Sequence, residues 1–133
     1  MNEMVTVEVT TQIFGLGGGK PTAPTWVALN EHTVTARALI AEHVRSEIAQ
    51  AQQRRSSSLA LHYMLADDLQ AQPRAISPTL NCEREISRAW QGLKDRRYVL
   101  VVDGIAIDDL DTSISLTERS HVSFVRLLQL VGG

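Results

Sequence analysis

The chain ends in "QLVGG", and its last two residues, Gly132 and Gly133, have no side chains. Since glycine makes up roughly 7% of an average protein, two glycines at one terminus arise by chance about once in 200 sequences. Such an end presents the α-carboxylate of Gly133, a group whose ordinary pKa is roughly 3.5. At neutral pH it is ionised and can act as a nucleophile. Two glycines also have no Cβ atom to obstruct a narrow channel, and they adopt backbone angles that other residues cannot.

The glycine-rich segment "GLGGGKPT" is the second stretch that suggests chemistry, because glycine and lysine are typical of phosphate-binding loops. That pattern requires a glycine five residues before Gly19, where this chain has Phe14. It also requires Ser or Thr after the lysine, and Lys20 is followed by Pro21. The segment therefore predicts a flexible hairpin loop rather than a nucleotide site.

The histidines and the single cysteine do not have the spacing of a metal site. The four histidines are His32, His43, His62 and His121. We expect them at the surface or as hydrogen-bonded core residues. Cys82 lies near a predicted helix start, which can lower the pKa of a thiol, but it has no obvious basic partner. We therefore expect no enzyme activity, no metal and no bound cofactor in this chain itself.

Composition limits the remaining classes of function. The chain has 133 residues, enough for one domain with a real core, and its formal charge of −2 does not favour nucleic acid or an anionic membrane as a partner. One cysteine rules out an internal disulfide and indicates a reducing, cytoplasmic setting. No apolar run approaches the roughly 18 residues that are needed to span a bilayer.

The elements that must hold the C-terminal end begin with a predicted β-hairpin. "MVTVEVTTQIF" places Val5, Val7 and Val9 at alternate positions, which is typical of a half-buried strand. "GLGGGKPTAP" interrupts it, and "TWVALNEHT" predicts the returning strand. A helix is then predicted through "ARALIAEHVRSEIAQAQQRR", with Thr33 or Thr35 as its N-cap.

Two further helices and three strands are predicted for the rest of the chain. "LALHYMLADDLQAQ" has a helical repeat of apolar residues, and Asn81 can cap a helix in "CEREISRAWQGLKDRR". "RRYVLVVDG" is typical of a strand buried on both faces, and Asp103-Gly104 predicts a tight turn into "IAIDDLD". "HVSFVRLLQL" is the last strand, with Val122 and Phe124 facing the core. A sheet covered on one face by a helix would bury these faces together, so we expect an α+β fold.

Residues 98–133 resemble the C-terminal half of the small sulfur-carrier proteins of molybdopterin and thiamine synthesis. The matching stretches are "VVDG", "DLDTSISL", "HVSF" and "VGG". The last eight residues, "RLLQLVGG", are similar to the leucine-rich tail of ubiquitin, with Leu128 and Leu130 at the matching alternate positions. Both families share the β-grasp fold. The resemblance therefore implies one ubiquitin-like domain over residues 1–133, with a mixed sheet of four to five strands, a covering helix and a flexible tail at 128–133.

The resemblance also implies a chemistry for Gly133. In these families a separate activating enzyme uses ATP and magnesium to convert the terminal carboxylate into an acyl-adenylate. The acyl group then passes to a thiol, or receives sulfur as a thiocarboxylate. Further implied partners of a modifier are a conjugating enzyme, a deconjugating peptidase and target proteins. The residues expected to contact these partners are Val125, Leu127, Leu128, Leu130 and Val131.

Two features of this chain differ from the compact β-grasp carrier proteins. Residues of roughly 52–95 would form a helical insertion, and the first loop is longer than usual. Alignment on the final glycines also places Arg126 where ubiquitin has an inward apolar residue. The register of the last strand matters here, because a slip of one residue would exchange its two faces.

Three functions remain open on this evidence. The first is a protein modifier, which "LLQLVGG" and the enlarged body favour; the second is a sulfur carrier for cofactor or tRNA synthesis. The third is a non-covalent β-grasp interaction domain with an inert tail. A longer precursor that is trimmed to Gly133 also fits. If the chain is a modifier, lysine-linked polymers can grow only through Lys20, Lys94 or the amino terminus, because every other basic residue is an arginine.

Overall fold

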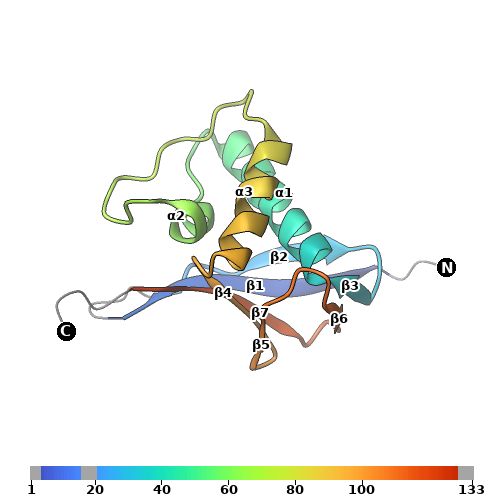
Figure 1. Cartoon of the computed structure of the whole chain (residues 1–133). Helices are drawn as coiled ribbons and strands as arrows, with labels where there is room; N and C mark the ends of the chain where they lie inside the picture. The colour runs from blue at the N-terminus through green and yellow to red at the C-terminus, as the bar shows by residue number, and fades with distance from the viewer. Residues whose placement is uncertain (1–3, 16–20, 129–133) are drawn as a thin grey trace, which may run out of the picture.

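The computed structural model describes residues 4–15 and 21–128, and its main feature is a five-stranded sheet covered on one face by helices (Figure 1). The strands are β1 (Val5–Phe14), β2 (Thr25–Leu29), β3 (Thr33–Thr35), β4 (Val99–Val102), β5 (Ile105–Ile107), β6 (Ser113–Ser115) and β7 (His121–Leu127). The helices are α1 (Ala36–Arg54), α2 (Leu59–Leu65) and α3 (Cys82–Lys94). The expected α+β class is confirmed.

The first and last strands of the chain lie side by side in the middle of the sheet. The strand order is β2-β1-β7-β4-β5, and β1 and β7 are parallel whereas the other neighbours are antiparallel. β3 and β6 form a separate antiparallel pair. The sequence did not predict β6, because its three residues are too few to show a period. The mixed sheet itself agrees with the prediction.

The tight turn predicted after β4 is present. Val102 of β4 pairs with Ile105 of β5, which leaves Asp103 and Gly104 as a two-residue connection. Both residues have positive φ angles, 50° and 83°. This backbone is typical of a type I′ hairpin turn, whose twist matches that of the flanking strands.

The helix starts follow the predicted caps. The Thr35 hydroxyl accepts a hydrogen bond from the Ala38 amide at the start of α1, and the Asn81 side chain accepts one from the Arg84 amide at the start of α3. α1 is 19 residues long, and in the described parts of the chain no helix is long and apolar enough to cross a bilayer.

α2 is shorter than its sequence pattern predicts. The helical pattern continues through "ADDLQAQ", but α2 ends at Leu65 and Ala66 has an extended backbone with ψ 138°. The prediction of a longer helix is therefore wrong. At the end of α2, backbone carbonyls accept hydrogen bonds from arginine side chains of other elements rather than from amides of a further helical turn.

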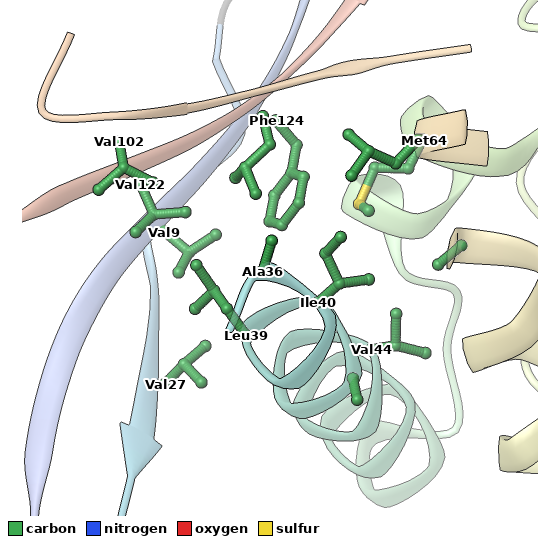
Figure 2. Close-up of a cluster of buried hydrophobic side chains, with 14 of the residues drawn as sticks. Val9, Val27, Ala36, Leu39, Ile40, Val44, Met64, Val102, Val122 and Phe124 are labelled. Carbon is green, nitrogen blue, oxygen red and sulfur yellow. The ribbon is translucent and has the colours of Figure 1, made fainter. Parts of the chain in front are cut away.

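The core fills the space between the sheet and the three helices. Figure 2 shows Val9 and Val122 of the sheet beside Leu39 of α1, and Phe124 of β7 pointing toward α1 near Met64 of α2. All five side chains are at most 1% exposed. Val122 and Phe124 thus face the core, as predicted.

The outer face of the sheet has no helix over it (Figure 1). β4 was expected to be buried on both faces, and this expectation is wrong. Leu100 and Val102 are buried under the helices, whereas Val99 and Val101 point to the other face and are only partly buried. An apolar run alone does not distinguish a central strand with one open face from one that is covered on both sides.

Candidate site at the carboxyl end of the central strand

The chain leaves the sheet from its central strand. β7 pairs with β1 as far as Phe14 and Leu127, whereas its pairing with β4 reaches only Val125 and Val99. The Leu128 amide then donates a hydrogen bond to the Phe14 carbonyl at 2.9 Å. The last described residues are therefore held by β1 on one side, and the other side of the backbone is free of β4.

Gly15 allows this close approach of β1 and Leu128. Its φ angle is 144°, in a region that glycine favours. A Cβ atom built on Gly15 would lie 2.9 Å from the Leu128 Cβ atom, closer than carbon atoms pack. Glycine is thus required here on two grounds, backbone angle and space.

Four apolar side chains gather on the open face of the sheet at this end, and we call them the outer patch. They are Phe14, Val99, Val125 and Leu127. Phe14 lies opposite Leu127 and Val99 lies opposite Val125, so the four are neighbours in the sheet. Phe14 is 66% exposed and Leu127 is 53% exposed, and the two valines are partly buried. An exposed apolar cluster of this kind is typical of a partner-binding surface.

Arg126 points to the opposite face, under the helices. It follows Val122 and Phe124 at alternate positions, so the register is the one given by alignment on the final glycines. Its Nη1 atom donates hydrogen bonds to the carbonyls of Tyr63 at 3.2 Å and Ala66 at 3.0 Å, with the Met64 carbonyl at 3.4 Å. Burial, together with the nearby Arg97, lowers the pKa of the Arg126 guanidinium from its ordinary value.

Two further arginines meet the same end of α2. The Leu65 carbonyl accepts hydrogen bonds from Arg97 Nη1 at 3.0 Å and from Arg88 Nη2 at 3.2 Å. Arg97 Nη1 also contacts Asp67 Oδ1 at 2.7 Å. A helix leaves its last carbonyls without partners and with a partial negative charge, which cations stabilise. We call Arg88, Arg97 and Arg126 the arginine clamp, because they fasten α2 to α3, to the segment before β4 and to β7.

A groove of about 600 Å³ lies beside the clamp. Its walls are residues 67–70, 95–97 and 126–128. The segment that follows α2 and the root of the tail therefore face one shared space. Sequence reasoning missed this arrangement, and its one signal was an arginine at an apolar position of the last strand.

The other predicted site residues divide into two groups. Leu128 is 37% exposed, and Lys94 is exposed as the last residue of α3. The remaining residues of the predicted site lie outside the described part of the chain: Lys20, Leu130, Val131, Gly132 and Gly133.

The described ends of the first loop continue the β-hairpin. The Thr22 amide donates to the Thr11 carbonyl at 2.8 Å, and the Thr11 amide donates to the Thr22 hydroxyl at 3.1 Å. Residues 16–20, which include the glycines and Lys20, lie outside the described residues.

One histidine differs from its prediction. His43 is 1% exposed in the core, and within the described residues neither ring nitrogen has a hydrogen-bond partner. The expectation of a surface or hydrogen-bonded position is therefore wrong for His43. Nδ1 of His32 lies 3.0 Å from the Leu116 carbonyl, and Nε2 of His62 lies 3.2 Å from the Leu69 carbonyl.

No group of three or more His, Cys, Asp or Glu residues that could hold a metal occurs in residues 4–15 and 21–128.

Cys82 is the first residue of α3 and is partly buried. Burial raises the pKa of its thiol above the ordinary value and outweighs the opposite influence of the nearby Arg45. The direction of this shift is opposite to the lowering that a helix start can cause.

Comparisons of the chain with models of known protein families, with curated protein sequences and with solved structures give no match. The site must therefore be interpreted from its own geometry. That geometry consists of a central strand leading to the C-terminal residues, an exposed apolar patch on one face and a clamped helix on the other.

Proposed function

We propose that this protein is a ubiquitin-like modifier that is activated at the Gly133 carboxylate by an ATP-dependent enzyme and conjugated to target proteins. The proposed fold is the ubiquitin-like β-grasp. The strand order β2-β1-β7-β4-β5, with parallel β1 and β7 in the centre and α1 following the first hairpin, supports it. On this proposal α2 and α3 belong to a helical insertion at roughly 52–95 between α1 and β4.

The observation that carries the proposal is the exit of the chain from the central strand. Leu128 is held against Phe14, and five residues follow it in the sequence. An extended segment of that length reaches roughly 17 Å, enough to insert a terminal carboxylate into an enzyme while the body stays outside. The two final glycines would pass through a narrow channel because they have no side chains.

The proposed activation needs no catalytic group from this chain. A carboxylate oxygen of Gly133 attacks the α-phosphorus of ATP, the bond to the β-phosphate oxygen breaks, and pyrophosphate leaves. The activating enzyme would hold ATP and magnesium and would supply the catalytic groups. The outer patch, with Val125 and Leu127, and the tail residues Leu128, Leu130 and Val131 would contact that enzyme. A cytoplasmic setting is part of this proposal.

A sulfur carrier is the second candidate, because its activation begins with the same adenylate. The Asp103-Gly104 turn after β4 is the feature of the described fold that matches the resemblance to such carriers. In that case the adenylate would receive sulfur and end as a thiocarboxylate. A non-covalent interaction domain would use the outer patch alone, and its tail would be inert.

The test is activation of the purified chain by the adenylating enzyme of the ubiquitin-activating type that the same genome encodes. With ATP and magnesium, ATP–pyrophosphate exchange and intact mass would be measured, using a chain extended by one alanine after Gly133 as the control. Exchange with the native chain alone, followed by a thioester to the enzyme, supports the modifier. A mass increase from replacing one oxygen by sulfur, when a sulfur donor is added, favours the carrier. No exchange with the native chain would contradict both.

A further inference from the structure

The arginine clamp connects the helical segment between α1 and β4 to the strand that leads to the reactive end. Arg126 is two residues before Leu128, and its Nη1 atom donates to the carbonyls of Tyr63 and Ala66 at the end of α2. In Figure 1, α2 lies above the end of β7 from which the chain continues to its C terminus. An apolar residue at this position could pack under α2 but could not donate to its carbonyls.

Different parts of the molecule lie on the two sides of the backbone at Leu127 and Leu128, where the chain leaves β7. β1 holds one side through the hydrogen bond from the Leu128 amide to the Phe14 carbonyl. On the other side β4 pairing has ended at Val99, and the groove walls 67–70 and 95–97 lie there instead. An enzyme that binds the chain at Leu127 and Leu128 would lie next to this groove, because both residues are part of its wall.

We propose that α2 and the segment after it are a specificity element for the activating enzyme, and that Arg126 is the positioning residue that holds this element beside Leu127 and Leu128. This inference rests on the proposed function. The enzyme would contact residues 67–70 together with Leu127 and Leu128. Carriers without this helical segment would offer no such wall, so the element would select the cognate enzyme from others that accept a Gly–Gly end.

The groove wall is polar, and its side chains are held by contacts within the chain. Asp67 is already paired with Arg97 at 2.7 Å, and Asp95 accepts a hydrogen bond from the Gln91 side chain. Asp68 accepts a hydrogen bond from the Gln70 amide, which fixes the turn after α2. The wall is thus formed by residues that hold one another in place, and its exposed side chains Asp68 and Gln70 remain accessible to a partner.

The first test compares Arg126→Leu, Arg126→Lys and Arg119→Leu in ATP–pyrophosphate exchange, varying the concentration of the chain. Arg119 is an exposed arginine in the loop at the other end of β7, so it controls for the loss of one charge. We expect Arg126→Leu to raise the KM for the chain about tenfold, equivalent to roughly 1.4 kcal/mol of binding, with kcat little changed. Arg126→Lys should have a smaller effect than Arg126→Leu, because a lysine keeps a positive charge and can still donate to one or more of these carbonyls, although it lacks the planar guanidinium. A KM for Arg126→Leu equal to that of the native chain would overturn the inference.

Amide hydrogen exchange supplies a readout that does not need the enzyme. In Arg126→Leu the amides at the end of α2 should exchange faster, including that of Ala66, which donates to the His62 carbonyl, while those of Val7 and Phe124 in the core stay protected. Unchanged protection of α2 would show that Arg126 does not hold it, and would overturn its positioning role.

A surface variant keeps the inference testable if Arg126→Leu does not fold. Gln70→Arg places a large side chain on the groove wall, and Gln53→Arg makes the same change on an exposed position of α1. We expect the first to raise the KM severalfold and the second to leave it unchanged; equal values for both would overturn the inference. If the native chain supports ATP–pyrophosphate exchange but the variants do not differ from it, this inference alone is contradicted. If the native chain supports no ATP–pyrophosphate exchange, the proposed function is contradicted as well.

Discussion

The imidazole of His43 stacks on the ring of Phe124 in the core, with the ring centroids 4.7 Å apart and the planes at 15°. His43 comes from α1 and Phe124 from the central strand β7. Within the described residues neither nitrogen of His43 has a hydrogen-bond partner, and burial lowers its pKa to about 3. Thr11, the β1 residue paired with Phe124, also has a buried hydroxyl for which the described residues provide no partner. Within the part of the chain that the structure describes, the core therefore holds two unpartnered polar side chains, and of these His43 is the one whose protonation would oppose folding.

This burial predicts a loss of stability in acid. The unfolded chain takes up a proton on His43 below its ordinary pKa of about 6.5, whereas the folded chain keeps the ring neutral down to about 3. The contribution of neutral His43 to the free energy of unfolding is therefore complete above pH 6.5. Below pH 6.5 it falls by up to about 1.4 kcal/mol for each pH unit. Urea unfolding of the native chain and of His43→Leu at pH 7 and pH 5 should show a difference of roughly 2 kcal/mol in their pH dependence.

The matched control for this prediction is His121→Gln, which changes an exposed histidine on β7. It should keep the pH dependence of the native chain. If His43→Leu and the native chain lose stability in parallel between pH 7 and pH 5, the acid sensitivity does not come from His43.

Glu47 joins three elements through a buried carboxylate. Its two oxygens accept hydrogen bonds from the hydroxyls of Thr25 on β2 and Ser58 at the N-cap of α2, each at 2.9 Å. We expect Glu47→Ala to lower the free energy of unfolding by about 2–3 kcal/mol, because it leaves both hydroxyls without an acceptor. Glu42→Ala, which removes an exposed carboxylate paired with Arg45, should cost less than about 1 kcal/mol. Similar costs in urea unfolding would show that the bridge does not stabilise α2.

Gly15 should tolerate substitution less well than Gly104. Both have positive φ angles, but an added Cβ at Gly104 meets no atom within 4 Å, whereas at Gly15 it lies 2.9 Å from Leu128. Gly104→Ala therefore measures the cost of the backbone angle, about 1–2 kcal/mol. Gly15→Ala should be less stable than this and should also speed hydrogen exchange of the Leu128 amide. Normal protection of that amide in Gly15→Ala would contradict the close approach of β1 and the tail.

The outer patch should be needed for activation but not for folding. Leu127→Asp introduces a charge at an exposed position, so its melting temperature should stay near that of the native chain. We expect its ATP–pyrophosphate exchange to fall about tenfold in kcat/KM, the cost of roughly 1.4 kcal/mol of binding. Ile105→Asp is the control, because Ile105 is 66% exposed on β5 and lies outside the patch. Equal loss in both variants would point to a general effect of the added charge.

The scarcity of lysine predicts attachment of single copies to targets. Lys94 is exposed at the end of α3 and Lys20 lies outside the described residues, and no other lysine is present. A variant with Lys20→Arg and Lys94→Arg and a blocked amino terminus should still be conjugated. Its conjugates should have the mass of one added copy, and abundant polymers of this variant would contradict lysine-linked chains.

Local patterns predicted most elements of the fold. Alternating valines predicted β1, the Asn81 cap predicted the start of α3, and Asp103-Gly104 predicted the turn between β4 and β5. For α1 the sequence offered Thr33 or Thr35 as the cap, and the structure has Thr35. These features depend on a few neighbouring residues, so they can be read directly from the chain. The alternation in β7 likewise predicted the buried positions of Val122 and Phe124.

Only the tertiary structure decided the features that depend on distant residues. The end of α2, the open outer face of β4 and the unpartnered burial of His43 each arise from elements that are far apart in the sequence. Arg126 is the clearest case, since its position was predictable but its hydrogen bonds to α2 carbonyls some sixty residues earlier were not. The sequence determined where β1 and β7 lie and where α3 begins, because alternation and helix caps depend on neighbouring residues. The packing of α2 against β7 determined what lies beside Leu127 and Leu128, because contacts between distant segments form only when the chain folds.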